Sequence, residues 1–468
     1  MGKTKGDLIK ALTETVRGRL ITPSHADYDD ARAVYNGMHD RRPLAVIQCA
    51  DSADVMAAIS AARDGGDAGG LDLAIRGGGH SVPGFGTVDD GLVIDLSRMN
   101  NVRIDPAKKV ARVGGGATWG DVDHATYPFG LAVPAGVIST TGVGGLTLGG
   151  GIGYLTRSVG LTIDNLLSAD VVLADGRQVT ASDYQNEDLF WALRGGGGNF
   201  GVVTSFEFQL HEVGDIVGGP IFFEFDDAAT VLACYRDYIA EAPERLGCFF
   251  GWQIAPDLPF IPEDRVGDLF CVLVTCWNGP HAEAERVLKP LRDAAEVQAE
   301  FVEVMSFPAL NSLFDDSVPK GMQHYWKADF ITELTEEAIA AHVEHGANTP
   351  HISSSMHLHP INGAAQRVGA DETAFGHRDK NFSPVIAGIW DDPADNEANI
   401  QWVRDYYDAI HPHSGSDGGY VNFMSEDDGQ RSPANYGANY ERLAAVKATY
   451  DPDNVFHVNQ NIAPANGG

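Results

Sequence analysis

The sequence predicts an α+β protein with two domains, and three observations lead to this class. The chain has 468 residues, of which 44% are apolar and 21% charged, so it can bury a large core. Strand and helix patterns are mixed along the whole chain. Near Gly214 the pattern changes from short, glycine-rich segments to longer strands that alternate with polar helices, which indicates a second domain.

The first part of the chain alternates short strands and helices. Residues 43–49 form an apolar run that predicts a buried strand, and residues 52–63 have the apolar period of a helix with Ser52 as its N-cap. Further strands are expected at 73–75, 92–96, 110–113, 168–173 and 202–210, with a helix at 118–125 and a loop at 134–153.

The second part has longer apolar runs, at 221–225 and 269–274, which predict strands. Helices are expected near 227–241, 281–295, 334–345 and 396–410, and two more strands at 353–360 and 420–423. Such a pattern favours a sheet with helices on one face. A last helix begins near Asn439 and ends before Pro452.

Composition excludes several classes of function. The net charge of -32 would repel nucleic acids and anionic membrane surfaces, so neither is an expected partner. We find no signal peptide and no apolar run long enough to span a membrane, and therefore expect a soluble, cytoplasmic protein. The five cysteines are scattered without a CxxC pair, which predicts buried thiols and no metal site.

The most informative feature of the composition is its high glycine content. The chain has 54 glycines, and they are densest between Arg76 and Gly153, which indicates backbone wrapped closely round a flat or phosphorylated group. Residues 196–201 match the GxGxxG dinucleotide fingerprint, but a strand pattern follows them where a Rossmann fold needs a helix. No P-loop and no GxSxG elbow occurs.

The segment Arg76-Gly77-Gly78-Gly79-His80-Ser81 follows an expected strand. Its glycine amides can close on phosphate oxygens, Arg76 can add charge, and His80 is presented at the strand end. The alternative is a glycine turn with a surface histidine. The segments 134–157 and 160–165, and the tail with Tyr450-Asp451-Pro452 and Asn459-Gln460-Asn461-Ile462, accompany it.

Together these motifs resemble the berberine-bridge-enzyme-like branch of the vanillyl-alcohol-oxidase / p-cresol-methylhydroxylase (PCMH) flavoprotein family, over about residues 43–464. The resemblance implies a PCMH-type FAD-binding domain at 1–213, an antiparallel-sheet substrate domain covered by helices on one face at 214–425, and a C-terminal segment at 426–468 that returns to the FAD domain.

The same resemblance implies that His80 bonds covalently to the 8α-methyl group of FAD and that residues 76–81 hold its pyrophosphate. Many relatives add a cysteinyl bond, but this chain has Ile138 at that position, so we expect attachment through His80 only. Where many relatives have Gly-Gly-His, this chain has Gly144-Gly145-Leu146. The expected cofactor-binding residues are Arg76, Gly77, Gly78, Gly79, His80, Ser81, Gly136, Val137, Ser139, Thr140, Thr141, Gly142, Gly144, Gly145, Gly149, Gly153, Asp164, Asn165, Gly201, Val202, Asn422, Asn459 and Gln460.

Substrate oxidation needs a C–H aimed at the flavin and a group that takes a proton. His357 and His359 share one strand face, either as catalytic residues or as polar residues on a solvated face; a metal site is disfavoured because no third ligand is nearby. Tyr420 resembles the family's tyrosine beside the substrate, and it can act as a base only if its pKa is well lowered. Further candidates for the pocket are Tyr154, Tyr325 and Lys327, whereas Tyr436 and Tyr440 are expected to pack.

The sequence therefore predicts an FAD-dependent oxidase that takes a hydride from an alcohol, hemiacetal or amine carbon of a small molecule and passes the electrons to O2. The alternatives are a dehydrogenase of the same fold that uses another acceptor and a non-catalytic flavin-binding protein. In relatives one side chain, three positions after the cysteine site, gates oxygen; here it is Thr141, whose small size favours an open path. The substrate and the oligomeric state are left open.

Overall fold

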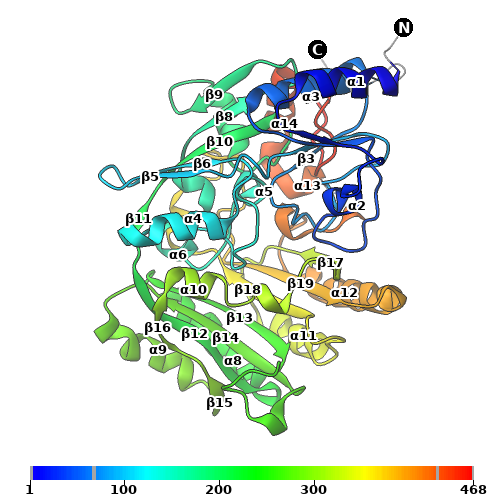
Figure 1. Cartoon of the computed structure of the whole chain (residues 1–468). Helices are drawn as coiled ribbons and strands as arrows, with labels where there is room; N and C mark the ends of the chain where they lie inside the picture. The colour runs from blue at the N-terminus through cyan, green and yellow to red at the C-terminus, as the bar shows by residue number, and fades with distance from the viewer. Residues whose placement is uncertain (1–3, 66–69, 428–431, 466–468) are drawn as a thin grey trace.

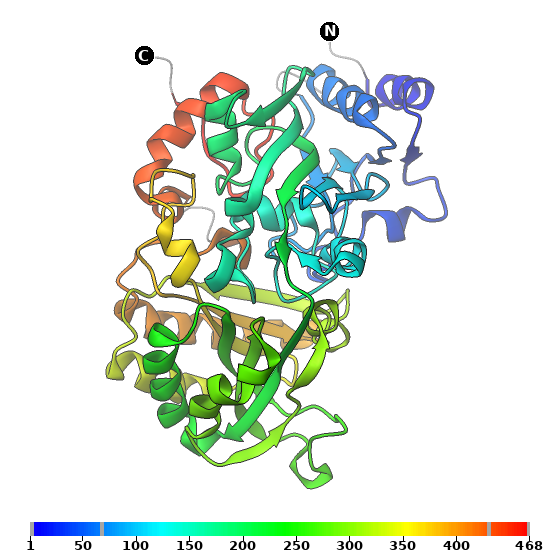
Figure 2. The same cartoon turned by 90° about the vertical axis from the view of Figure 1, so that its left-hand side faces the viewer.

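The computed structural model describes residues 4–65, 70–427 and 432–465. Two smaller sheets with their helices form the upper part in Figure 1, and one large sheet with its helices forms the lower part. Both ends of the chain lie on the upper part (Figure 2), because the last helix returns there after the chain has built the lower sheet.

The first sheet has the order β1-β2-β4-β3, and the glycine-rich region begins where its strand β3 ends. Its strands are β1 (Arg19–Ile21), β2 (Ala45–Gln48), β3 (Leu73–Arg76) and β4 (Leu92–Asp95), of which β2, β3 and β4 run parallel. Helices α1 (Lys5–Thr15) and α3 (Ser52–Asp64) cover it, and α2 (Tyr28–Arg32) lies between β1 and β2 in the chain. The prediction that Ser52 caps α3 is wrong: Asp51 is the N-cap, because its carboxylate accepts the N–H groups of Ala53 and Asp54.

The second sheet is antiparallel, with the order β5-β6-β10-β8-β9. Its strands are β5 (Val102–Asp105), β6 (Val110–Gly114), β8 (Leu166–Val172), β9 (Gln178–Ser182) and β10 (Val202–Gln209), and a small pair joins β7 (Leu131–Ala132) to β11 (His211–Glu212). The helices of this region are α4 (Trp119–Thr126), α5 (Val143–Gly149), α6 (Thr156–Val159), α7 (Glu187–Leu193), α13 (Ser432–Tyr436) and α14 (Tyr440–Tyr450).

The third sheet is antiparallel, with the order β15-β12-β14-β13-β18-β19-β17 and β16 also paired with β12. Its strands are β12 (Asp215–Glu224), β13 (Leu246–Ile254), β14 (Leu269–Trp277), β15 (Val297–Glu300), β16 (Glu303–Ser306), β17 (Gln323–Ala328), β18 (Ser355–Pro360) and β19 (Phe382–Trp390). The neighbouring helices are α8 (Ala228–Glu241), α9 (Ala284–Arg292), α10 (Phe307–Asn311), α11 (Glu336–Gly346) and α12 (Asn396–Ile410).

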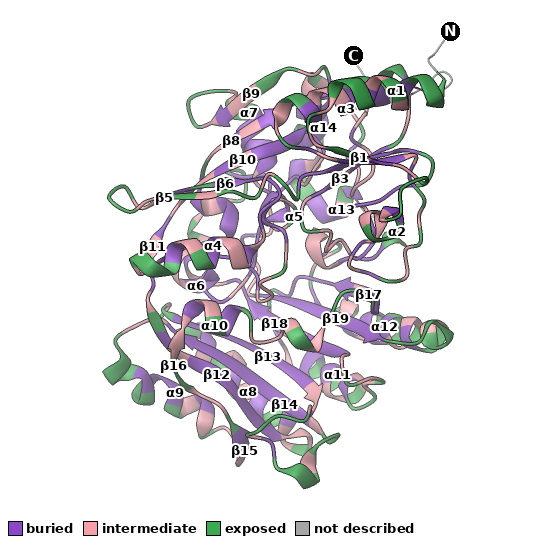
Figure 3. Ribbon diagram, in the orientation of Figure 1, coloured by how far each residue is buried: buried purple, intermediate pink, exposed green. Residues whose placement is uncertain are grey.

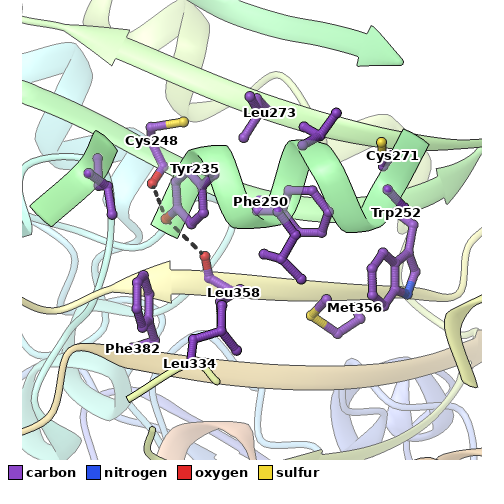
Figure 4. Close-up of a cluster of buried hydrophobic side chains, with 14 of the residues drawn as sticks. Tyr235, Cys248, Phe250, Trp252, Cys271, Leu273, Leu334, Met356, Leu358 and Phe382 are labelled. Carbon is purple, nitrogen blue, oxygen red and sulfur yellow. Dashed lines mark hydrogen bonds between the residues drawn. The ribbon is translucent and has the colours of Figure 1, made fainter. Parts of the chain in front are cut away.

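Helices α8, α9, α11 and α12 pack on one face of the third sheet, which confirms the expected arrangement. In Figure 4, Phe250 and Leu358 of the strands lie close to Tyr235 of α8, and Met356 lies beside Trp252. The Tyr235 hydroxyl lies 2.9 Å from the carbonyl oxygen of Cys248, so the one polar atom that this ring buries has an acceptor. Figure 3 shows the strands largely buried, as a sheet covered on both faces requires.

Two local predictions are wrong. The loop expected at 134–153 contains helix α5. Its C-cap, Gly150, has a φ of 135°, which most other residues avoid. Residues 421–423 form a 3-10 turn instead of a strand, because the N–H of Phe423 bonds to the carbonyl of Tyr420 at 2.9 Å. The turn still brings Tyr420 and Asn422 together, as described below.

Contacts between α4 and α10 join the upper and lower parts. The amide of Asn311 donates to the buried carboxylate of Asp123 at 2.8 Å. Burial, with a smaller contribution from the nearby Asp315, raises the pKa of Asp123 to about 7, although the hydrogen bond from Asn311 acts to lower it. The folded protein therefore holds a proton on Asp123 at a pH where an unfolded aspartate has lost it.

We expect Asp123→Asn to stabilise the protein at pH 8 by about 2 kcal/mol and to have little effect at pH 4. The folded pKa lies above the ordinary 3.8, so stability is lost as the pH rises from about 4 through 7, and the neutral amide abolishes this loss. Urea unfolding of both proteins at the two pH values measures the difference. Equal unfolding midpoints at pH 8 would contradict the raised pKa.

Candidate functional site

A cavity of about 370 Å³ is lined by both parts of the molecule. Its upper wall comes from the glycine-rich segments that follow β3 and β7, the loop before β10 and the C-terminal tail. Its lower wall comes from β13, β17, β18 and β19, on the face of the third sheet opposite α8 and α12. A volume of this size is typical of a small-molecule or cofactor site.

Glycine is required where the two glycine-rich segments cross. A Cβ atom on Gly78 would lie 2.5 Å from the backbone nitrogen of Gly142, and one on Gly142 would lie 2.3 Å from that of Gly78. Neither position admits a side chain, because the clash is with backbone. The crossing exposes bare backbone from both segments to the cavity, as a flat or phosphorylated ligand requires.

His80 lines the cavity at this crossing. Its ring stacks on Tyr35, with centroids 3.9 Å apart, and its Nε2 lies 3.0 Å from the hydroxyl of Thr140. Burial lowers the pKa of His80 to about 4, so the imidazole is neutral at neutral pH. A neutral imidazole has a nitrogen lone pair that can bond to an electrophilic carbon.

The side chain of Arg76 forms a buried ion pair with Asp95 beside the cavity. Its guanidinium donates to the carboxylate of Asp95 at 2.8 Å and to the carbonyl of Ala31 at 2.5 Å, and both charged side chains are buried. The pair neutralises most of the positive charge expected to face phosphate. Its Nη1, however, is buried without a hydrogen-bond partner among the described residues, and it remains a donor for a ligand.

A buried ion pair holds the C-terminal tail in its place beside the cavity. Lys447 donates to the carboxylate of Asp451 at 2.6 Å and to the carbonyls of Asn199 and Phe456. This fixes the tail against the loop before β10 and brings Asn459 and Gln460 into the cavity wall. Both amide atoms of Gln460 are buried without a partner in the described chain, which is the arrangement expected of a group that awaits a ligand.

Tyr420 and Asn422 line the cavity together. The Tyr420 oxygen accepts hydrogen bonds from the N–H of Gly151 at 2.7 Å and from the amide of Asn422 at 2.8 Å. Burial nevertheless raises the pKa of Tyr420 to about 12, against the effect of these bonds. The base role expected from the sequence requires a lowered pKa, so this structure does not favour it.

His357 and His359 lie on one face of β18 and both line the cavity, so the alternative of a solvated strand face is wrong. The Nε2 of His357 lies 3.1 Å from the hydroxyl of Ser355. Burial lowers the pKa of His357 to about 4 and that of His359 well below its ordinary value. Both rings are therefore neutral near pH 7. Among the described residues no cluster of side chains could hold a metal ion.

Three candidates for substrate contact lie outside the cavity wall. Tyr154 is buried against Phe249, with ring centroids 5.7 Å apart, and its hydroxyl has no partner among the described residues. The hydroxyl of Tyr325 donates to Asp427, and Lys327 forms an ion pair with the same carboxylate, because both side chains point to the far side of β17. The expectation that these three residues line the pocket is wrong.

Several expected cofactor residues also lie outside the wall. Asp164 forms a buried ion pair with Arg378, and Asn165 donates to the carbonyls of Val159 and Leu161. Ser139 bonds to Asp315, and Thr140 reaches the site only through His80. The remaining residues outside the wall are Gly149, Gly153 and Val202, which pack against Asn422, Ala135 and the core respectively. Every other expected cofactor residue lines the cavity.

The sequence gives no signal for three wall residues, Tyr35, His324 and Trp326. Tyr35 stacks on His80, and its backbone N–H bonds to the carbonyl of Gly79 at 3.0 Å. His324 and Trp326 occupy the face of β17 opposite Tyr325, and both ring nitrogens of His324 are buried without a partner in the described chain. Side chains alternate between the two faces of a strand, so β17 would predict both positions once its cavity-facing side is known.

The residues present fit an FAD cofactor. Bare glycine backbone, the partnerless amide of Gln460 and the neutral imidazole of His80 are the groups that a phosphate, a flavin edge and a covalent bond require. The five cysteines all lie outside the described wall, whereas Ile138 lines it. Four of the thiols are buried and Cys234 is half-buried, close to the expectation. No helix in the described ranges is long and apolar enough to cross a membrane.

Comparisons with known proteins agree with this site. A family model described as an FAD binding domain matches residues 43–182, and one described as berberine and berberine like matches residues 419–463. An uncharacterized FAD-linked oxidoreductase, YgaK, of Bacillus subtilis is 32% identical over 458 residues, covering 96% of this chain and 97% of the relative. The (R)-6-hydroxynicotine oxidase of Paenarthrobacter nicotinovorans is 32% identical over 467 residues, covering 96% and 97%.

Among solved structures, 6-hydroxy-D-nicotine oxidase from Arthrobacter nicotinovorans matches with a TM-score of 0.84 and 29% identity, over 96% of this chain and 98% of that chain. Fold, cavity and matches define a flavoprotein oxidoreductase of the PCMH-type fold. The chain belongs to the berberine-bridge-enzyme-like family of FAD-linked oxidoreductases.

Proposed function

We propose that this protein is an FAD-dependent oxidase whose cofactor is attached through His80 alone and whose substrate is a small alcohol, hemiacetal or amine. The observation that carries the proposal is the neutral imidazole of His80 in the cavity wall, between two glycine-rich segments that leave backbone bare. Attachment through a cysteine has no support, because none of the five thiols lies in the described wall. A hydroxynicotine oxidase is found both among the relatives by sequence and among the solved structures, which favours the reaction class.

FAD held at this site would supply the redox chemistry, which is oxidation of a substrate carbon by hydride transfer and reduction of O2 to hydrogen peroxide. The protein positions the cofactor and the substrate. The glycine backbone around Gly78 and Gly142 and the amide of Gln460 would hold the cofactor. Asn422 is positioned by its hydrogen bond to the Tyr420 hydroxyl. The inner face of the third sheet, with His357 and His359, meets the substrate and excludes bulk water.

Thr141 supports the use of oxygen, since it lines the cavity with a small side chain. We expect Thr141→Leu to slow reoxidation by O2 by about tenfold or more, because the added bulk fills the path beside the cofactor. Substrate reduction of the flavin should change little. Stopped-flow measurement of the two half-reactions separates these effects, and equal slowing of both would place Thr141 in the substrate site.

Replacing Tyr420 tests the base role. Because the pKa of Tyr420 is raised, we expect Tyr420→Phe to slow flavin reduction by about tenfold, through the loss of the acceptor that holds Asn422. The pH profile should keep its shape. A loss of about a hundredfold together with a changed pH profile is the behaviour of a general base and would restore the role predicted from the sequence.

An anaerobic screen tests the proposed function. Holoenzyme is mixed with sugars, phenolic alcohols, polyketides and alkaloids, the flavin band is followed for bleaching, and air is then admitted with a peroxide-coupled assay. Bleaching followed by peroxide is the expected result. Bleaching that air does not reverse identifies a dehydrogenase with another acceptor, and a flavin that no compound bleaches supports a non-catalytic flavin-binding protein.

A further inference from the structure

The substrate side of the cavity is built from rings. On the inner face of the third sheet, His324 and Trp326 of β17 lie with centroids 5.7 Å apart, and Trp326 lies 6.2 Å from Phe423. Phe423 in turn lies 5.8 Å from His359, which lies 5.7 Å from His357. Five rings therefore follow one another along this wall, and a flat ring is the shape that such a surface contacts best.

The same cavity wall carries no unpaired formal charge among the described residues. Although the chain has 65 Asp and Glu residues, none of them lines the described part of the cavity, and no Lys does. Arg76 lines it, but its charge is paired with Asp95. Burial lowers the pKa of His357 to about 4 and that of His324 to about 3, so these imidazoles are neutral at pH 7. An ammonium group here would lose its hydration and meet no carboxylate.

The wall does offer neutral hydrogen-bonding groups. His324 is 2% exposed, and both of its ring nitrogens lack a partner among the described residues, as does the indole nitrogen of Trp326. Such groups bind best to a ligand that both donates and accepts, which a hydroxyl does and an ammonium does not. We propose that the substrate is an uncharged, ring-bearing alcohol whose hydroxyl is held by the neighbouring side chains of His324 and Trp326. This inference rests on the proposed oxidase function and narrows its substrate class.

Two matched probes test the charge preference on the holoenzyme. They are 2-naphthalenemethanol, which is neutral, and 2-naphthylmethylamine, which is protonated at pH 7.5, and anaerobic titration of the flavin absorption band gives a Kd for each. We expect the alcohol to bind about tenfold or more tightly than the ammonium. An ammonium that binds as tightly as the alcohol, for instance through the faces of the rings, would overturn the inference.

A charge variant makes the test specific. His357→Asp places a carboxylate in the wall and should narrow the preference for the alcohol by about fivefold or more. The control is His124→Asp, the same substitution at an exposed position of α4 outside the cavity, which should leave the preference unchanged. An unchanged ratio in a flavin-loaded His357→Asp protein would overturn the inference.

The substrate class and the oxidase function give different results when either is wrong. If the flavin is present and neither naphthalene probe perturbs its spectrum, the substrate class is wrong while the oxidase function stands. If purified wild type holds no flavin, the proposed function itself fails.

Discussion

His80→Ala is expected to release all of its flavin into the supernatant when the holoenzyme is precipitated with acid, whereas wild type keeps its flavin in the yellow pellet. The reason is chemical: alanine has no nitrogen to bond to the cofactor, while the neutral imidazole of His80 carries a free lone pair. The packing around the site should survive, because the stacked ring of Tyr35 stays anchored by the backbone bond from its N–H to Gly79.

A matched control keeps this prediction specific. His324 is also a neutral imidazole in the wall of the same cavity, with its ring centroid 5.2 Å from that of Tyr35. His324→Ala should therefore retain the bond and keep its flavin in the pellet. Flavin in the supernatant for wild type would show that no covalent bond forms, and a flavopeptide that contains a cysteine would show a second attachment.

Lys447→Met is expected to destabilise the protein by about 3 kcal/mol or more and to weaken cofactor binding. Lys447 and Asp451 are fully buried, and the ammonium donates to three acceptors: one carboxylate and two carbonyls. Methionine leaves the carboxylate of Asp451 uncompensated inside the protein. Since the pair ties the tail to the loop before β10, Asn459 and Gln460 should also lose their places in the cavity.

Urea unfolding and flavin content measure these two effects. The double variant Lys447→Met/Asp451→Asn removes both charges, and it should recover part of the lost stability, because a neutral amide can still accept the N–H of Val455. A single variant that unfolds within about 1 kcal/mol of wild type would contradict a structural role for the pair.

Much of the fold follows from local patterns in the sequence. The apolar runs at 269–274 and 202–210 predict β14 and β10, and the helical period at 396–410 gives the bounds of α12. These predictions succeed because each element buries a continuous stripe or face. The prediction of the N-cap of α3 is wrong, because aspartate and serine are both common N-cap residues and only the backbone geometry selects Asp51 over Ser52.

The cofactor side of the site can be predicted from the positions of the glycines in the sequence. The crossing of Gly78 and Gly142 needs glycine at both positions, so its mark is visible in the sequence. The substrate side is less predictable. Tyr35 and His80 are 45 positions apart, and their stacking depends on how the segment after α2 packs on β17, which no local pattern encodes.

A missed strand and burial explain the other errors. The sequence pattern predicts no strand at β17. In the structure the strand turns His324 and Trp326 toward the cavity, whereas Tyr325 and Lys327 lie on the opposite face. Burial explains the error at Tyr420: the sequence places the tyrosine near the cavity but does not show that burial outweighs its two hydrogen bonds and raises its pKa. The sequence shows which ionisable side chains are present, whereas the direction of their pKa shifts follows only from burial in the folded structure.

Reoxidation of the reduced flavin by O2 distinguishes an oxidase from a dehydrogenase, and its measurement needs no known substrate. Holoenzyme is photoreduced without oxygen and mixed with air-saturated buffer in a stopped-flow instrument, while peroxide is assayed in the product. An oxidase should regain its oxidised spectrum within seconds and release one hydrogen peroxide for each flavin. Reoxidation that takes many minutes, with fast turnover on an added electron acceptor, would contradict the account and identify a dehydrogenase.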